Sequence, residues 1–326
     1  MKNQVWRRIV QIARDVRSLL RRPTTLLRLA RYIDAQDAPS FASILRSSLP
    51  REFVDHTATR LVGRLDPSIV LEFERNGLRW RAPCGDSVTI GLLESGHWQG
   101  QAIDGLVSWM QARGFEPTSK TWLDIGANIG TTTVALAASG CRVVAVEPSP
   151  RNVSLLRFNT TSNGLTERVE IVEAAIIDGV DDAVDFTEGA AHGMGHLAVE
   201  SSQSRRVPAM NIEGLLAKVG LDARQVAAVW CDVEGAEGFV IQSGAGLWSA
   251  GVPLFAELVP GHLERFTSIP TVVSLLRQHF SSFVSASDLE VLGADARERP
   301  IGELTPETIG MYGDVLLLPG KHCAAA

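Results

Sequence analysis

After residue 120, short apolar runs alternate with segments of helical pattern. The runs have the composition of strands buried on both faces, and they cover residues 121–125, 141–146, 168–177, 226–231 and 253–258. Helices are predicted over residues 131–139, 149–162, 211–219 and 271–280. Residues 282–292 and 311–318 are expected to supply a closing pair of strands. Strands that alternate with helices predict an α/β fold with a doubly wound, mostly parallel sheet.

The first third of the chain has a different pattern. Residues 1–32 repeat apolar residues at helical spacing, starting from Trp6 and Ile9. Residues 68–92 alternate apolar and polar positions, which predicts a β-hairpin, with a turn at Cys84 to Asp86, that can cover one mouth of a site. The predicted organisation is a basic helical extension (1–66), a hairpin and helix (67–115) and an α/β domain (116–320).

The first apolar run of the α/β domain ends in a glycine turn. The sequence TWLDIGANIG places a buried strand before Gly126, and Gly130 follows just before the next helix. Glycine lacks a Cβ, so the backbone can turn sharply and approach a ligand closely. Free backbone N–H groups at such a turn can face a polar cofactor. Asp124 lies inside the strand end, where burial of a carboxylate is costly unless the group is used.

A second acid follows one strand later. Glu147 ends the run CRVVAV, 21 residues after Gly126, near the spacing at which an acid at the tip of the second strand binds ribose hydroxyls. This combination predicts an adenosine-type cofactor. Dinucleotide-binding turns have a glycine where Asn128 stands, and the Asp124 carboxylate repels pyrophosphate but suits a positively charged amino group. S-adenosylmethionine (SAM) is therefore favoured over a nicotinamide cofactor, and the pattern D-x-G-x-N-x-G is similar to that of class I SAM-dependent methyltransferases.

Four blocks of sequence together resemble the FkbM-type family of SAM-dependent O-methyltransferases. They are LDIGANIGTTT (123–133), AVEPSPRNVSLLRFNTTSN (145–163), WCDVEGAE (230–237) and FAELVP (255–260). The resemblance implies a class I fold with a seven-stranded Rossmann-like sheet, and methyl transfer from SAM to a hydroxyl group. The family often has an aromatic residue followed by glutamate before these blocks, whereas here Trp98 is followed by Gln99.

The resemblance also implies where the cofactor binds. The expected cofactor-binding residues are Asp124, Gly126, Asn128, Gly130, Glu147 and Asp178. Glu147 is expected to bind the ribose diol, while Asp124 and the glycine turn hold the amino acid end. Asp178, near the end of the third strand, is a candidate for the adenine edge, although an aspartate before Gly179 is also ordinary in a turn.

The fourth strand ends in a group of acids. Asp232 ends the strand, Glu234 lies two residues later, and Glu237 lies three residues beyond that, at the edge of the sheet where open α/β folds bind ligands. Asp232 and Glu234 are candidates for the general base, or, together with Glu237, for ligands of a divalent metal that lowers the pKa of the hydroxyl. Glu237 can instead cap a helix N-terminus. Glu257 ends the fifth strand at the same edge.

Histidines provide another kind of base candidate, since an imidazole titrates near neutral pH. The candidates are His192, His196 and His262. His196 is preferred, because the sequence HGMGHL matches a loop that borders the acceptor pocket in the family that the chain resembles.

The charge distribution limits the partners. Residues 1–32 contain nine basic residues and one acidic residue, a net charge of +8, which leaves −14 for the rest of a chain whose total is −6. An acidic body disfavours nucleic acid as the substrate. Together with the hydroxyl acceptor that the resemblance implies, the expected substrate is a small-molecule or glycan hydroxyl. The basic segment can lie on an anionic membrane surface, pack on its own domain or self-associate. The chain has neither an apolar run of eighteen residues nor the apolar region of a signal peptide, which predicts a cytoplasmic protein, with peripheral attachment to the inner membrane face left open.

Three functions remain open. The leading one is a SAM-dependent O-methyltransferase that acts on a hydroxyl of a sugar, glycan or natural product. A nicotinamide-dependent oxidoreductase is the second, but neither Tyr32 nor Tyr312 has a lysine four residues later, as short-chain dehydrogenases require. The third is a non-catalytic, membrane-recruited SAM-binding protein, against which the intact Asp124 and Glu147 count.

Overall fold

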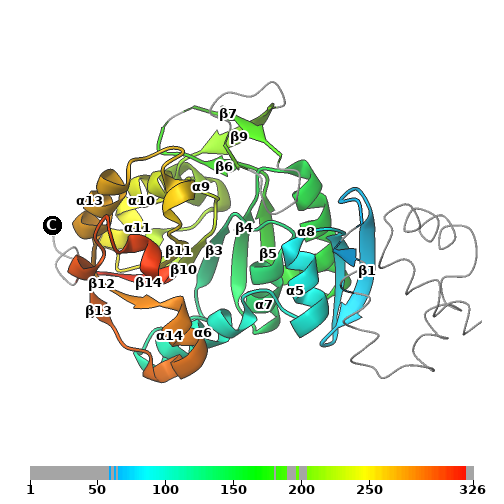
Figure 1. Ribbon diagram of the computed structural model, residues 1–326, viewed down its shortest axis with the longest axis horizontal. Helices are drawn as coiled ribbons and strands as arrows, with labels where there is room; N and C mark the ends of the chain where they lie inside the picture. The colour runs from blue at the N-terminus through cyan, green and yellow to red at the C-terminus, as the bar shows by residue number, and fades with distance from the viewer. Residues whose placement is uncertain are drawn as a thin grey trace, which may run out of the picture. The chain divides into compact units, whose positions relative to one another are not determined.

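Eight strands of the described chain form the central sheet of the computed structural model (Figure 1). The structure describes residues 59, 62–63, 65–179, 181–188, 196–197 and 204–320. The strands are β3 (Thr121–Ile125), β4 (Arg142–Val146), β5 (Val169–Val172), β10 (Val226–Cys231), β11 (Leu254–Glu257), β12 (Phe280–Ser285), β13 (Arg299–Pro300) and β14 (Asp314–Pro319). Their order is β13-β12-β14-β11-β10-β3-β4-β5, and the five strands from β11 to β5 are parallel. The mostly parallel α/β sheet is confirmed, with one strand more than expected because the two-residue β13 pairs with β12.

Helices cover both faces of this sheet. Adjacent residues of a strand point to opposite faces, so Trp122 packs on one side and Leu123 on the other. The core on the Trp122 side includes side chains of α5 (Ser87–Ser95), α6 (Gly100–Ala112), α7 (Thr131–Ala138), α8 (Pro150–Ser162) and α14 (Ala286–Leu292). The core on the Leu123 side includes side chains of α9 (Ile212–Val219), α10 (Glu237–Ser243), α11 (Ala245–Ser249) and α13 (Ile269–His279). The sheet is therefore doubly wound, as predicted, and the strand order reverses between β3 and β10.

Two segments differ from their predicted structure. The third strand ends at Val172, and β6 (Ala175–Ile176) joins a separate sheet of order β6-β9-β7-β8 with β7 (Ala183–Thr187), β8 (His196–Leu197) and β9 (Arg205–Met210). The described parts of residues 180–210 therefore contain three strands, in a region for which no strand was predicted. The strand predicted over 282–292 is wrong beyond Ser285, because the Ser285 hydroxyl accepts a hydrogen bond from the N–H of Asp288 and caps α14.

The predicted hairpin is present, but it turns earlier than expected. β1 (Val70–Arg75) and β2 (Leu78–Pro83) pair antiparallel, and Asn76 and Gly77 join them with φ values of 51° and 76°. Two positive φ values are what a two-residue hairpin turn requires, and Asn-Gly supplies them readily. The predicted turn at Cys84 to Asp86 instead leads into α5, which Asp86 caps by accepting a hydrogen bond from the N–H of Val88.

Two asparagines at the end of α8 hold the outer edge of β2. The Asn159 side chain accepts from the N–H of Arg81 (2.6 Å) and donates to the Arg81 carbonyl (3.1 Å). Asn163 makes the same pair of bonds with Arg79, both at 2.8 Å. The Asn159 amide also donates to the carbonyl of Ile129 at 2.8 Å, which connects the hairpin to the glycine turn.

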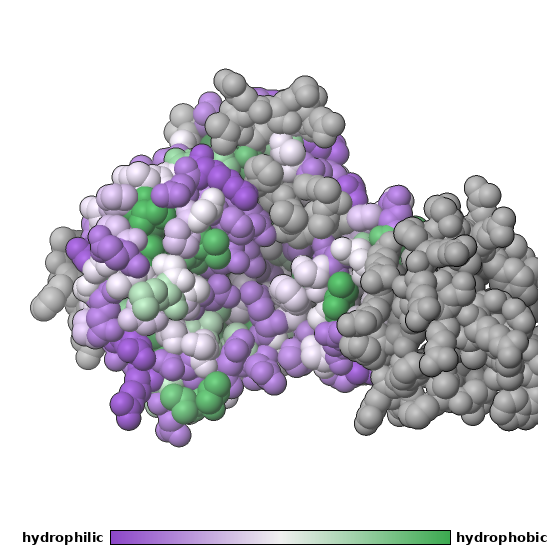
Figure 2. All heavy atoms as spheres, viewed as in Figure 1, coloured by the Kyte–Doolittle hydropathy of each residue, from purple (hydrophilic) through white to green (hydrophobic). Residues whose placement is uncertain are grey.

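The visible surface is largely polar, with hydrophobic residues at separated places (Figure 2). The exposed large hydrophobic residues of the described chain are Ile69, Val70, Val291, Leu292 and Met311. In the described residues, no helix is both long enough and apolar enough to cross a membrane. The predicted basic helix at 1–32 lies outside the described residues, so its role and the predicted cellular location stay predictions.

Gly126 lies where the ends of β3 and β10 meet. Its φ is +88°, and a Cβ at this position would lie 1.8 Å from the carbonyl oxygen of Asp232. The N–H of Asp232 in turn donates to the carbonyl of Ile125 at 3.0 Å. The close approach that requires glycine here is therefore that of the protein's own backbone. Gly126 also lines the pocket described below, and its predicted contact with a ligand stays a prediction.

Gly126→Ala is expected to lower the free energy of unfolding clearly more than Gly140→Ala. Gly140 has a similar φ of +96°, but nothing lies within 4 Å of its would-be Cβ. Both variants carry the cost of a left-handed alanine, about 1–2 kcal/mol, whereas only Gly126→Ala must also displace the Asp232 backbone. Urea unfolding of the two variants measures the difference. Equal losses would mean that the contact with Asp232 does not constrain this turn.

Candidate functional site

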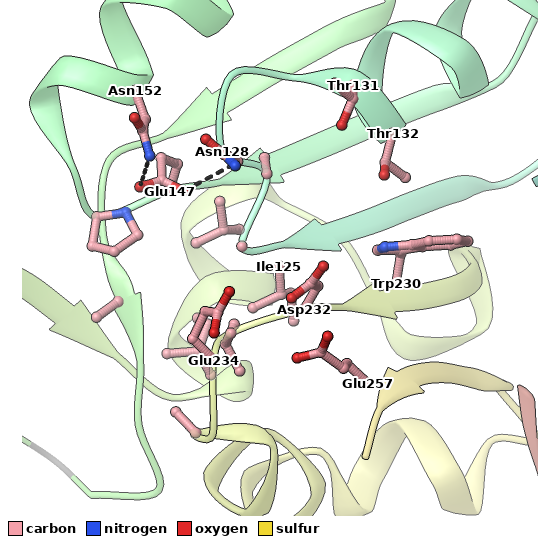
Figure 3. A pocket seen from close by; sticks show the side chains of 18 of the residues that line it. Ile125, Asn128, Thr131, Thr132, Glu147, Asn152, Trp230, Asp232, Glu234 and Glu257 are labelled. Atoms are coloured by element: carbon pink, nitrogen blue, oxygen red, sulfur yellow. Dashed lines mark hydrogen bonds between the residues drawn. The ribbon is translucent and has the colours of Figure 1, made fainter. Parts of the chain in front are cut away.

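A pocket opens at the carboxyl ends of β3, β4, β10 and β11, where the strand order reverses. Figure 3 shows its polar side chains in two groups. The first, which we call the Glu147 side, consists of Asn128, Glu147 and Asn152. The second, which we call the acidic side, consists of Asp232, Glu234 and Glu257. An apolar wall near the Glu147 side is formed by Pro148, Ala174, Ala175, Ile176, Phe186 and Leu197.

The Glu147 carboxylate organises its side of the pocket. One oxygen accepts the N–H of Asn128 (2.9 Å), and the other accepts the N–H of Ser149 (2.8 Å) and the amide of Asn152 (3.4 Å). Glu147 is 5% exposed, and burial raises its pKa to about 7. Because a carboxylate has about four lone-pair sites and three are taken, it can still accept a hydrogen bond from a ligand.

The glycine turn pairs its own N–H groups. Gly126 and Ala127 both donate to the carbonyl of Val146, at 2.9 and 3.0 Å, and Gly130 donates to Ala127 at 2.8 Å. The expectation of free N–H groups is therefore wrong for these residues. The turn instead presents the side chain of Asn128, whose Oδ1 is buried and makes no hydrogen bond. An unpaired buried acceptor beside a pocket suits a ligand that brings a donor, such as an ammonium group.

Two of the predicted cofactor residues support the turn rather than border the pocket. Asp124 lies outside the described lining; it is 1% exposed and accepts a hydrogen bond from the hydroxyl of Thr133. Burial raises the pKa of Asp124 to about 7. Gly130 has a φ of +93° and packs against Leu156. The contact of either residue with a cofactor stays a prediction.

Asp178 and His196 are placed less directly. Asp178 lines a second depression together with Arg206 and Phe266, and it lies outside the described lining of the main pocket. The backbone of His196 belongs to β8, next to Leu197, which does line the pocket. The side chain of His196 and the whole of His192 lie outside the described part of the structure. The roles predicted for Asp178 and His196 therefore stay predictions.

The acidic side brings several carboxyl groups close together. Burial raises the pKa of Asp232 well above its ordinary value, and the charges of Glu257 and Glu234 raise it further. Burial, followed by the charge of Glu234, raises the pKa of Glu257 to about 8. The described lining of the pocket contains no lysine or arginine. These carboxyl groups are therefore suited to take up a proton or to face a positive charge.

A tight turn sets Glu234 beside His262. Glu234 has a φ of 55°, and a Cβ on the next residue, Gly235, would lie 2.2 Å from the carbonyl of His262. The two backbones are therefore in close contact. His262 belongs to α12 (Pro260–Leu263), and its Nδ1 lies 3.1 Å from Oε2 of Glu234 and 3.4 Å from Oε2 of Glu257.

Glu237 points into the protein interior. It is 1% exposed, and its Oε1 accepts the N–H groups of Val233 (3.1 Å) and Gly235 (3.4 Å). Both N–H groups belong to the turn that precedes α10, so Glu237 holds this turn, and the capping of the helix N-terminus considered for Glu237 is not what the structure shows. The metal set predicted with Glu237 differs from the group that the structure assembles, because the metal-capable group among the described residues is Glu234, Glu257 and His262.

Several lining residues carried little signal in the sequence. They are Trp98, Gln99, Thr131, Thr132 and Trp230. Gln99 stood out only as a departure from a family pattern, yet it lines the pocket with a φ of 55°, and its amide donates to Asp314 at 3.4 Å. Trp230 stacks on Phe255 with ring centroids 3.9 Å apart, a contact that depends on the pairing of β10 with β11.

The acids of the pocket lie within a segment of known family. Residues 124–279 match the family model of the methyltransferase FkbM domain. This segment is a methyltransferase FkbM domain. The resemblance carried by the four sequence blocks is confirmed. The methyltransferase domain contains both the Glu147 side and the acidic side, whereas Asp86, Trp98 and Gln99 reach the pocket from the preceding segment.

Other comparisons are more distant. No curated protein matches the chain. A transferase from Pyrococcus horikoshii is 12% identical, with a TM-score of 0.36 and coverage of 86% of this chain and 97% of that one. A 16S rRNA methyltransferase from T. thermophilus is 14% identical, with a TM-score of 0.37 and coverage of 78% and 50%. An O-methyltransferase from Bacillus cereus, in complex with SAH, is 14% identical, with a TM-score of 0.35 and coverage of 68% and 80%. Similarities at this level add nothing to the assignment of the methyltransferase domain.

Glu237→Gln is expected to gain stability relative to the parent methyltransferase as the pH rises from about 5 to about 8. Burial raises the pKa of Glu237 to about 8, so over this range the folded state holds a proton that the unfolded state has released. The free energy of unfolding of the parent therefore falls with rising pH, and that contribution is absent in the variant. Glutamine keeps the acceptor oxygen, and Oε2 of Glu237 makes no hydrogen bond.

Urea unfolding at several pH values measures this difference. Glu264→Gln, at an exposed position, is the matched control and is expected to follow the parent. Parallel pH profiles for Glu237→Gln and the parent would contradict the raised pKa.

Proposed function

We propose that the protein is a SAM-dependent O-methyltransferase whose acceptor is a hydroxyl of an uncharged sugar, glycan or natural product. One observation carries this proposal. A single pocket has Glu147, whose carboxylate suits a ribose, on one side and a group of carboxyl groups at the ends of β10 and β11 on the other. A methyl donor bound between them would present its methyl group to an acceptor on the acidic side.

The residues of the pocket fit the cofactor. The Glu147 carboxylate can accept a hydrogen bond from a ribose diol, and the unpaired Oδ1 of Asn128 can accept one from an ammonium group. The apolar wall formed by Pro148, Ala174, Ala175, Ile176, Phe186 and Leu197 suits an adenine ring. SAM has no phosphate, so the lack of lysine and arginine in the described lining does not weaken its binding.

In the proposed reaction, SAM supplies a methyl group on a positively charged sulfur. The pocket holds the acceptor hydroxyl in line with the breaking carbon–sulfur bond, and the oxygen forms the new bond to the methyl carbon. The hydroxyl proton passes to a carboxylate of the acidic side, for which Asp232 at the end of β10 is the first candidate. The electron pair of the broken bond remains on sulfur, so the sulfonium becomes a neutral thioether.

Charge narrows the class of acceptor. Three carboxyl groups border the acceptor end, and the described lining has no basic side chain to balance them. The described lining therefore offers an anionic acceptor no positively charged partner, and each of these carboxyl groups that is ionised would repel it. Phosphorylated sugars and nucleic acid are disfavoured for these reasons. A neutral hydroxyl compound avoids this cost.

Calorimetric titration with S-adenosylhomocysteine, the demethylated product, tests the cofactor assignment. Micromolar binding is expected, with no binding of NADH. Glu147→Ala is expected to weaken binding at least about tenfold, roughly 1.4 kcal/mol for a lost charged contact. Glu170→Ala, on the exposed side of β5, is the matched control and should bind as the parent does. NADH binding, or an unchanged affinity in Glu147→Ala, would contradict the assignment.

A panel of acceptors in matched neutral and phosphorylated forms tests the acceptor class. Release of S-adenosylhomocysteine is expected with neutral hydroxyl compounds and is expected to drop by about tenfold or more with their phosphorylated forms, because the carboxylates repel them. Mass spectrometry locates the methyl group, which is expected on oxygen. A product methylated on nitrogen or carbon, or a preference for RNA, would overturn the acceptor class and leave the cofactor assignment intact.

A further inference from the structure

Three potential ligand atoms converge next to the acidic side: two come from Glu234 and Glu257, which line the pocket, and one from His262, which lies outside its described lining. One atom each of Glu234, Glu257 and His262 lies within 4.8 Å of the other two, and Nδ1 of His262 is close to Oε2 of both glutamates. The three residues come from three separate elements: the turn after β10, the end of β11 and α12. Figure 3 shows the Glu234 and Glu257 carboxylates on the same side of the pocket. From this convergence we infer a binding site for one divalent transition-metal ion.

The distances fit ligands that share an ion. Nδ1 of His262 lies 3.1 Å from Oε2 of Glu234 and 3.4 Å from Oε2 of Glu257. With metal–ligand bonds of about 2.1 Å, neighbouring ligands are about 3.0 Å apart in octahedral geometry and about 3.4 Å apart in tetrahedral geometry. Both measured separations fall within this range, and the two carboxylates lie within 4.8 Å of each other.

Hydrogen bonding does not account for the convergence. Nδ1 of His262 and Oε2 of Glu257 are buried atoms, and neither makes a hydrogen bond. Nδ1 lies within ion-pair distance of both carboxylates, so a protonated imidazole would supply them with a donor. A neutral imidazole leaves these buried atoms unsatisfied, which is costly. A cation bound to both atoms and to Glu234 would remove this cost and would balance the charge of the acidic side.

The mixture of ligands indicates the type of ion. One imidazole with two carboxylates suits Mn²⁺ or Zn²⁺, whereas Ca²⁺ and Mg²⁺ prefer oxygen ligands alone. Three protein ligands leave further coordination positions for other ligands, and two of the three residues, Glu234 and Glu257, line the pocket. The role of the ion in catalysis rests on the proposed function. The oxygen of the acceptor hydroxyl would occupy an open coordination position, where the ion would orient it and lower the pKa of the hydroxyl.

The site is tested by titrating the metal-stripped full-length protein with MnCl₂ and following the free Mn²⁺ signal by electron paramagnetic resonance. One ion per chain is expected to bind, with competition by ZnCl₂. His262→Ala and Glu257→Gln are expected to weaken binding at least tenfold. The matched controls, His279→Ala and Glu264→Gln, change the same residue types outside the cluster and are expected to bind as the parent does.

The same variants are titrated with S-adenosylhomocysteine, and their folding is checked by circular dichroism. Retained S-adenosylhomocysteine binding together with lost Mn²⁺ binding supports the metal site. If neither Mn²⁺ nor Zn²⁺ binds the parent, or if Mn²⁺ binds the two cluster variants and the parent equally, the metal site is overturned. In both of those cases, S-adenosylhomocysteine binding by the parent would leave the proposed function intact. If the parent does not bind S-adenosylhomocysteine, the proposed function is refuted, independently of the metal result.

Discussion

The junction between the ends of β3 and β10 determines the geometry of the pocket. The N–H of Asp232 donates to the carbonyl of Ile125, and the backbone of Gly126 lies directly against the carbonyl of Asp232. Gly126 begins the turn that leads to Asn128, while Asp232 begins the segment that carries Glu234. One backbone contact therefore fixes the spacing between the Glu147 side and the acidic side. The hydrogen bond is buried, and the backbones of Gly126 and Asp232 touch because Gly126 has no Cβ, so the two strand ends cannot move apart easily. The fold, rather than a ligand, therefore sets this spacing.

Backbone strain is concentrated around the pocket. Four non-glycine residues of the described chain have positive φ values, and three of them, Gln99, Asn128 and Glu234, line the pocket. Asparagine tolerates this conformation, whereas glutamine and glutamate adopt it at a cost. The surrounding structure holds them there: α6 begins directly after Gln99, and the turn of Glu234 is packed against α12. Strain of this kind is typical of positions where a side chain is aimed at a ligand.

The sequence predicted the parts of the molecule that depend on local pattern. Alternating strands and helices, the glycine turn and the acid at Glu147 follow from hydrophobic periodicity and spacing, and the structure places them as expected. The hairpin turn was predicted at Gly85 instead of at Asn76-Gly77, although Asn-Gly is the stronger turn signal in the sequence. The boundary at Ser285 was missed because a capping hydroxyl ended the strand.

The composition of the acidic side could not be predicted in the same way. His262 lies 28 residues from Glu234 in the sequence, and the two meet only because β11 pairs beside β10 and α12 folds back onto Gly235. Glu237 occupied the position of a ligand by spacing, but the N–H groups of Val233 and Gly235 take up its carboxylate. Whether backbone N–H groups or a ligand bind such a carboxylate depends on the three-dimensional structure, which cannot be read from the spacing of residues along the sequence.

The amide pairs of Asn159 and Asn163 also affect how the protein behaves towards its neighbours. The exposed edge of a short two-stranded ribbon offers alternating donors and acceptors, with which a strand of another chain can pair. On β2 these groups, from Arg79 and Arg81, are already taken by side-chain amides that imitate the backbone of an adjoining strand. The helix thus stands in for a third strand, and this edge is protected from pairing with a strand of another molecule.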